Sequence, residues 1–380
     1  MRKICYFINS DWYFDLHWLE RASYAQEVGY QIHIITNFVD QSLVTKLTKM
    51  GFICHNSSIS AQSVNPLKFA CELVNTTKLI KSINADVLHC ITIKPCLIGG
   101  LYAKIFSKNI VISFVGLGRV FTEKKFKFSL LKRLIIPLYN FIFSNKKSLL
   151  TFEHQSDRRC ILHSLKVDEN RTVVIDGAGI NIVDFPYSKE PLREIPVVLF
   201  ASRLLWSKGL TDLINVKNSL HLEGVEFTLN VAGIPTPNDP DAIPLGFLEE
   251  AHNKGEINWL GKCDDMKELI KDANIVALPS VYPEGIPRIL LEASSVGRAI
   301  ISYNVGGCSS LIENDVNGFI IDKGDINALA GCLKHLVINA DVRGRMGENG
   351  RKLIEGKFCS TIITKDTVNL YGYLLKNKAE

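Results

Sequence analysis

The chain has 380 residues, of which 47% are hydrophobic and 22% charged, and its formal net charge is +5. This composition excludes a disordered chain, and the length predicts two domains. The ten cysteines form no C-x-x-C pair, which excludes a zinc ribbon and a thioredoxin-type motif. Because no signal peptide and no membrane-spanning apolar run are evident, we expect a cytoplasmic protein with reduced thiols.

Short apolar runs alternate with amphipathic segments of helix length. Because the runs are continuously hydrophobic, they predict parallel strands that are buried on both faces. In the first half, the expected strands are Ile4–Ile8, Ile32–Thr36, Val87–Ile91, Ile110–Val115, Leu149–Phe152 and Val173–Ile175. In the second half, they are Val197–Ala201, Phe227–Ala232, Ile275–Leu278 and Ile300–Tyr303.

The series of strands and helices breaks once, at Asn181–Ile195, which contains Pro and charged residues and has little periodicity. We therefore predict an α/β protein with two doubly wound, Rossmann-like domains, residues 1–183 and 184–358. The C-terminal helix, 359–380, is expected to pack back on the first domain. Ligands bind outside the carboxyl ends of such strands, so we expect the site in a central cleft that the two domains face.

Polar residues follow the first expected strand. Asp11 and His17 are candidate ligand contacts in this segment, although a lone histidine is more often structural. His89 ends a later strand, and there we favour a structural role.

Two further segments, Thr92–Pro95 and Val115–Gly118, follow successive strands and are expected at the same edge of the sheet. Lys94 is a candidate phosphate contact, with an ordinary surface lysine as the alternative. Gly116 and Gly118 either admit a ligand chain or simply form a turn.

The stretch 119–147 contains eight Lys and Arg residues against one acid, Glu123, interleaved with aromatic and aliphatic residues. A basic amphipathic helix of this kind is typical of a membrane interface, so we expect contact with an anionic surface. Pro137 is expected to kink or split the helix. The alternative is a helix that packs its apolar side into the core. The candidate membrane contacts are Lys124, Lys125, Lys127, Lys132 and Arg133.

Two cations, Arg203 and Lys208, follow the first strand of the second half. Arg binds two oxygens and Lys acts as a point charge, which suits a diphosphate; a solvated loop is the alternative. The pair Asp239-Pro-Asp241 is interpreted as a solvated turn rather than a metal site, since both residue types favour turns.

Two glutamates, Glu284 and Glu292, flank a loop that turns into a helix. Pro287 suits the first helical position, where its missing N–H is not needed. The helix amides that follow, those of Arg288, Ile289 and Leu290, are then expected to point out of the helix and to bind phosphate. A carboxylate beside a phosphate site suits sugar hydroxyls, so this pattern indicates a sugar–phosphate ligand. The glycines Gly306 and Gly307 follow a later strand and allow a ligand to approach closely, or form a tight turn.

These motifs resemble, in order and spacing, those of the family 4 retaining glycosyltransferases, which have the two-domain GT-B architecture. Their pattern of two glutamates separated by seven residues matches Glu284 and Glu292. Their Arg-Leu…Lys-Gly pattern matches Arg203-Leu204 and Lys208-Gly209, and their Gly-Gly turn matches 306–307. The match is specific over roughly residues 170–325 and looser elsewhere.

The resemblance implies that Arg203 and Lys208 bind the donor diphosphate and that Glu292 binds the ribose. It places Glu284 near the donor sugar and the reacting carbon. The implied catalytic residues are therefore Glu284, Arg203 and Lys208, with retention explained by front-face attack. The expected donor contacts are Arg203, Lys208, Glu284, Gly285, Ile286, Pro287, Arg288, Ile289 and Glu292. No cofactor or metal is expected.

The segments Thr92–Pro95 and Val115–Gly118 also resemble those of the subset that extends sugars on polyprenyl diphosphate. The resemblance implies transfer of a hexose or N-acetylhexosamine, with UDP-GalNAc or UDP-GlcNAc as favoured donors, in O-antigen or other surface polysaccharide synthesis. The protein would then lie on the inner face of the cytoplasmic membrane and bind no nucleic acid. The alternatives are a non-catalytic nucleotide-sugar or lipid-binding protein and a GT-B epimerase. The candidate acceptor contacts are Asp11, His17, Lys94, Gly116 and Gly118.

Overall fold

The protein is described from a computed structural model, which covers residues 1–59, 66–116, 126–237, 239–282 and 285–376. The side chains of residues 66, 126–131 and 134 are also left undescribed. The chain folds into two compact units, Met1–Ala178 with Thr361–Glu380, and Gly179–Ser360.

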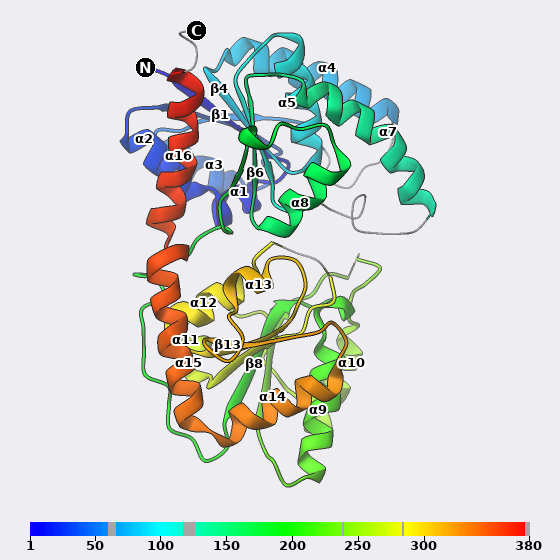
Figure 1. Ribbon diagram of the computed structural model, residues 1–380, viewed down its shortest axis with the longest axis vertical. Coiled ribbons are helices and arrows are strands. Elements are labelled where there is room, and N and C mark those ends of the chain that lie inside the picture. The colour runs from blue at the N-terminus through cyan, green and yellow to red at the C-terminus, as the bar shows by residue number, and fades with distance from the viewer. Residues whose placement is uncertain (60–65, 117–125, 238, 283–284, 377–380) are drawn as a thin grey trace. The chain divides into compact units, whose positions relative to one another are not determined.

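The first unit contains a seven-stranded sheet in which all neighbouring strands are parallel, in the order β3-β2-β1-β4-β5-β6-β7 (Figure 1). Its strands are β1 (Lys3–Phe7), β2 (Gln31–Thr36), β3 (Ile53–Asn56), β4 (Val87–Ile91), β5 (Ile110–Phe114), β6 (Ser148–Phe152) and β7 (Thr172–Val174). Its helices are α1 (Asp11–His17), α2 (Leu19–Glu27), α3 (Gln41–Lys49), α4 (Pro66–Ile83), α5 (Ile93–Ile105), α7 (Phe126–Phe143), α8 (Gln155–Ser164) and α16 (Ser360–Lys376).

The second unit contains a six-stranded parallel sheet in the order β10-β9-β8-β11-β12-β13. Its strands are β8 (Val197–Arg203), β9 (Thr228–Ile234), β10 (Asn258–Trp259), β11 (Ile275–Leu278), β12 (Ala299–Tyr303) and β13 (Gly318–Ile321). Its helices are α9 (Leu210–Leu222), α10 (Leu245–Asn253), α11 (Met266–Asp272), α12 (Arg288–Val296), α13 (Cys308–Leu311), α14 (Ile326–Ile338) and α15 (Ala340–Leu353).

The order of the strands reverses once in each sheet, between β1 and β4 in the first unit and between β8 and β11 in the second. At such a point the chain leaves two adjacent strands toward opposite faces, which opens a crevice at their carboxyl ends. The predicted doubly wound α/β fold is thus confirmed for each unit. Every strand that we predicted is present, but the edge strand β13 and the short, partly exposed strands β3 and β10 were missed.

Each sheet is buried on both faces, as the continuous apolar runs predict. Strand β1 sends Ile4 and Tyr6 into one core and Cys5 and Phe7 into another. Helix α16 belongs to the first unit and covers one of these faces (Figure 1). Its buried residues in that core are Ile363, Val368, Leu370, Tyr371, Leu374 and Leu375.

A buried chain of hydrogen bonds crosses the first sheet and joins it to α16. The Tyr371 hydroxyl donates to Tyr6 over 2.9 Å and lies 2.7 Å from Nδ1 of His89. Nε2 of His89 lies 2.7 Å from Oγ of Ser113, which in turn lies 2.6 Å from Oγ1 of Thr151. His89 is fully buried, and burial lowers its pKa to about 3. The structural role predicted for His89 is confirmed.

Helix α7 runs through Pro137 without a break, so the predicted split at this residue is wrong. The last turns of the helix are fixed by packing, since Tyr139, Ile142 and Phe143 are buried. The helix thus continues although Pro137 removes one backbone hydrogen bond from its interior. Within the described residues, no helix is both long and apolar enough to cross a bilayer.

Candidate functional site

The two cations predicted to bind diphosphate lie where β8 ends, beside the point at which the strand order of the second sheet reverses. Arg203 is the last residue of β8 and its side chain is exposed. Lys208 ends the single turn Trp206–Lys208 and is only 5% exposed. Burial of a lysine is costly unless its ammonium meets polar groups, so this residue is not an ordinary surface lysine.

The loop after β8 is held against the loop after β11. The amide of Val281 donates to the carbonyl of Ser207 over 2.8 Å, and the Ser280 hydroxyl donates to the same carbonyl over 3.3 Å. Gly209 follows with φ +86°, and a Cβ at this position would lie 2.1 Å from the carbonyl oxygen of Pro279. Only a glycine fits here, because it adopts a positive φ and leaves room for the neighbouring backbone.

Asp241 holds the loop after β8 from the other side. Its carboxylate accepts hydrogen bonds from the amide and the hydroxyl of Ser207, and its carbonyl accepts from the amide of Trp206. Asp239 accepts from the amide of Asp241 over 3.0 Å and shapes the turn. The sequence indicated a plain solvated turn, so the positioning role of Asp241 was missed. Within the described residues, no group of three or more His, Cys, Asp and Glu side chains is placed to hold a metal ion.

Helix α12 begins one residue later than we predicted. Pro287 has ψ 125°, which is not helical, so it is the N-cap and Arg288 is the first helical residue. The amide of Leu290 already donates to the carbonyl of Pro287 over 3.1 Å. The Leu290 amide is therefore not free to point out of the helix. The predicted phosphate contacts are then limited to the amides of Arg288 and Ile289.

Glu292 lies in the second turn of α12 and is 7% exposed. Its Oε1 accepts a 2.8 Å hydrogen bond from Nε of Arg288, one turn earlier. Burial raises the pKa of the Glu292 carboxyl, and the Arg288 guanidinium opposes this rise. The pair fixes the carboxylate in place and leaves one of its oxygens for a further donor.

The glycine turn after β12 packs against the start of the same motif. A Cβ at Gly307 would lie 2.8 Å from Cγ1 of Ile286 and 2.9 Å from the backbone of Gly285. Gly306 has φ +53°, a conformation that favours glycine. The structure therefore brings together the three segments that the sequence singled out in the second half.

Several predicted site residues lie outside the described part of the chain. These are Glu284, Gly118, Lys124 and Lys125. Lys127 lies in α7, but its side chain is not described.

Asp11 starts α1 and is 5% exposed. Its carboxylate accepts from the amides of Trp12, Val39 and Asp40 at 2.7–3.0 Å and so joins two loops at the carboxyl edge of the sheet. These contacts give Asp11 a structural role, and its contact with an acceptor stays a prediction.

His17 ends the same helix and packs on Tyr13, with ring centroids 4.4 Å apart. Lys94 lies in the first turn of α5, where Nζ lies 3.2 Å from the buried carboxylate of Glu72. Gly116 follows β5 with φ +127° and has open space where a Cβ would lie. On α7, Arg133 is exposed and Lys132 is partly exposed. The functional roles predicted for these residues stay predictions.

Two family models match the chain. Residues 188–353, within the second unit, match the model for "Glycosyl transferases group 1". Residues 3–153, within the first unit, match the model for "Glycosyl transferase 4-like".

Curated relatives match over most of their length. One, from Campylobacter jejuni, is N,N'-diacetylbacillosaminyl-diphospho-undecaprenol alpha-1,3-N-acetylgalactosaminyltransferase; it is 27% identical over 87% of this chain and 89% of its own. Another, from Escherichia coli, is UDP-Gal:alpha-D-GlcNAc-diphosphoundecaprenol alpha-1,3-galactosyltransferase. It is 25% identical over 90% of this chain and 87% of its own.

Solved structures share the whole fold at low sequence identity. A glycosyltransferase from Rickettsia africae superposes with a TM-score of 0.79 at 21% identity, covering 99% of both chains. HepE from Anabaena, solved in complex with UDP and glucose, has a TM-score of 0.77 at 18% identity, covering 98% of this chain and 100% of its own. The GT-B fold class predicted from the sequence is thus confirmed.

The contact between Gly209 and Pro279 predicts that Gly209→Ala lowers the free energy of unfolding of the second unit. A positive φ costs alanine about 1–2 kcal/mol, and the clash adds about 1–3 kcal/mol. Gly224→Ala is the matched control, since its φ is +74° but nothing lies within 4 Å of the added Cβ. Urea denaturation of both variants would measure the difference, and equal losses would contradict the contact.

Proposed function

The chain belongs to the group 1 glycosyltransferases, and we propose that it transfers a hexose or N-acetylhexosamine from a UDP-sugar to a polyprenyl-diphosphate-linked sugar. The observation that carries this proposal is the convergence of three segments at the carboxyl edge of the second sheet. These are the loop with Arg203 and Lys208, the start of α12 with Glu292, and the turn at 306–307.

Each part of this site suits one part of a nucleotide sugar. A guanidinium, an ammonium and the N-terminus of a helix attract the diphosphate, because all three present donors and positive charge. Glu292 is held by Arg288 and accepts hydrogen bonds from the ribose hydroxyls. Glu284, carried over from the family motif, is assigned to the donor sugar. The Anabaena protein solved with UDP and glucose supports a UDP-sugar as donor.

The reaction breaks the bond between the anomeric carbon and the diphosphate oxygen and forms a bond to the acceptor oxygen. Negative charge grows on the leaving diphosphate, where Arg203 and Lys208 stabilise it. We propose retention by attack from the same face, with the acceptor proton passing to the leaving diphosphate oxygen. No protein base is then required.

The acceptor is proposed from the relatives, because two of them are named for transfer to undecaprenyl-diphosphate-linked sugars. Such an acceptor is anchored in lipid, so its transferase must work at a membrane surface. The basic segment 119–147 supports contact with an anionic surface, and Arg133 on α7 is exposed. We therefore propose that the protein binds peripherally to the inner face of the cytoplasmic membrane.

Replacing Arg203 or Lys208 with Ala is expected to lower kcat by about 100- to 1,000-fold while the fold is kept, because each removes a charge that stabilises the leaving group. Lys254→Ala is the control, since Lys254 has an exposed side chain in the same unit and pairs with Glu250 on the surface. Transfer would be followed by mass spectrometry with a panel of UDP-sugars and a polyprenyl-diphosphate-linked sugar. Near-normal turnover in both variants would refute the assignment.

Replacing Lys124, Lys125 and Lys127 with Gln is expected to weaken binding to anionic phospholipid vesicles by about 100-fold. Each cation near such a surface contributes about 1 kcal/mol. A matched triple variant at Lys254, Lys262 and Lys334 removes the same charge from exposed positions of the second unit and is expected to bind like the wild type. Vesicle sedimentation would compare them, and equal binding of all three proteins would exclude this membrane contact.

A further inference from the structure

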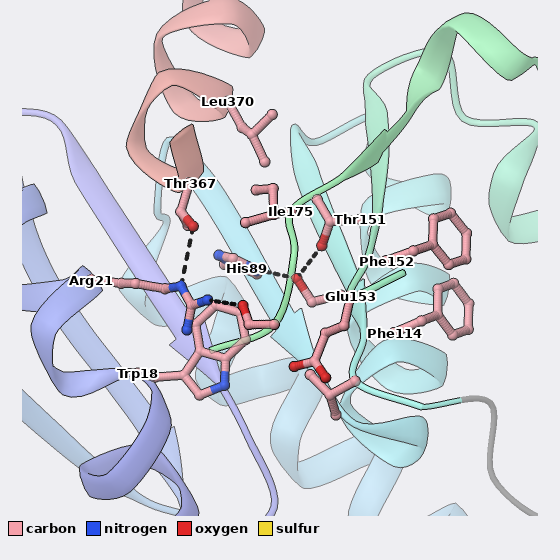
Figure 2. A pocket seen from close by; sticks show the side chains of 13 residues that line it. Trp18, Arg21, His89, Phe114, Thr151, Phe152, Glu153, Ile175, Thr367 and Leu370 are labelled. Atoms are coloured by element: carbon pink, nitrogen blue, oxygen red, sulfur yellow. Dashed lines mark hydrogen bonds between the residues drawn. The ribbon is translucent and has the colours of Figure 1, made fainter. Parts of the chain in front are cut away.

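A cavity lies at the carboxyl edge of the first sheet (Figure 2), and two polar side chains in its lining have no hydrogen-bond partner among the described residues. Residues from α2, β4, β5, β6 and α16 line it, together with residues that follow β6 and β7. The cavity has a volume of about 20 Å³, which is enough for one or two groups of the size of a water molecule. A hydroxyl group fits this space, and a whole sugar ring does not.

On one side of the cavity, the polar side chains have hydrogen-bond partners within the protein. Both ring nitrogens of His89 are bonded, to Tyr371 and to Ser113, and Ser113 lies within hydrogen-bond distance of Thr151. Arg21 is also engaged, since its three nitrogens donate to Thr367, to the carbonyl of Gly177 and to a carbonyl of α1. These groups serve the fold and need no ligand.

The indole of Trp18 differs from these groups. Trp18 is 5% exposed, and its ring is held in place by the Arg21 guanidinium, 4.5 Å from the ring centroid. Within the described residues, nothing accepts a hydrogen bond from its Nε1. A buried donor without an acceptor is costly, so an unpaired indole N–H beside a cavity points to a ligand atom that accepts from it.

Glu153 lies in the same cavity, immediately after β6. In the described part of the chain, no hydrogen bond reaches its carboxylate, which Figure 2 shows at the same end of the cavity as the Trp18 nitrogen. Burial raises the pKa of Glu153 to about 7; Arg21 opposes the rise, and Asp157 on α8 adds to it. His89 also lies in the lining and stays neutral, because burial lowers its pKa to about 3.

We propose that this cavity binds one hydroxyl group of the acceptor sugar, which accepts a hydrogen bond from Nε1 of Trp18 and donates one to Glu153. A hydroxyl does both, whereas a phosphate offers no donor and is repelled by a carboxylate, and an ammonium offers no acceptor. The inference rests on the proposed function, because it assigns a residue pair to the acceptor of that reaction.

The kinetic test uses undecaprenyl diphosphate carrying N-acetylglucosamine as acceptor, with UDP-galactose and UDP-N-acetylgalactosamine as donors. Trp18→Phe and Glu153→Ala are each expected to raise the acceptor KM by about tenfold or more, because each removes one hydrogen bond. The KM of the UDP-sugar is expected to stay unchanged. Glu20→Ala, which removes an exposed carboxylate from α2, is the matched control and is expected to behave like the wild type.

A stability measurement separates this role from a structural one. Between pH 4.5, the ordinary pKa of Glu153, and pH 7, the folded chain keeps a proton that the unfolded chain has lost. The stability of the wild type therefore falls as the pH rises through this window, and Glu153→Gln removes that loss. The variant is expected to be more stable than the wild type at pH 8, whereas a carboxylate that served the fold would leave it less stable.

The outcomes are distinct. If the wild type transfers sugar but the acceptor KM does not change in folded Trp18→Phe or Glu153→Ala protein, the cavity is not an acceptor site and this inference fails alone. A loss of stability in Glu153→Gln at pH 8 would also overturn it. If the wild type transfers no sugar from any donor, the proposed function fails, and this inference fails with it.

Discussion

The site in the second unit depends on the close approach of two loops that leave adjacent parallel strands. The loop after β8 meets the loop after β11 through the Ser207 carbonyl, and Gly209 lies so near Pro279 that no side chain fits between them. Because the strand order reverses between β8 and β11, the segments that follow these two strands run to opposite faces of the sheet beyond this contact. Lys208 and the start of α12 are thereby held at one edge.

In the described part of the first unit, some buried polar groups have hydrogen-bond partners and others do not. Tyr6, His89, Ser113 and Thr151 form one continuous buried chain with Tyr371 of α16, which fixes that helix to the sheet. A network of this kind is stable because each member has a partner. Among the described residues, the Trp18 indole and the Glu153 carboxylate beside it have no hydrogen-bond partner, and this difference carries the inference that they bind a substrate hydroxyl.

Most of the fold could be predicted from the sequence because a strand buried on both faces must be apolar throughout. Val87–Ile91 and Ile275–Leu278 match their predicted bounds for this reason. Strands β3 and β10 are partly exposed and include polar residues, so their sequences carry no comparable signal. The start of α12 was displaced by one residue, because proline is compatible with both the N-cap and the first helical position.

The site was predicted where its residues are close in sequence and missed where they are not. The proposed donor motif 281–294 is one continuous segment, and its neighbours at 203–209 and 306–307 have a recognisable order. In contrast, the contact of Asp241 with Ser207 joins residues 34 positions apart, and the cavity with Trp18 and Glu153 is completed by α16. Such partners are brought together only by the tertiary fold, and no local pattern marks them.

The most direct test of the donor site is a crystal structure of this chain with UDP bound. The diphosphate is expected to contact Arg203 and Lys208 at the carboxyl edge of the second sheet, with the ribose hydroxyls within hydrogen-bond distance of the Glu292 carboxylate. UDP bound at another place, or a diphosphate that touches neither cation, would contradict the proposed donor site.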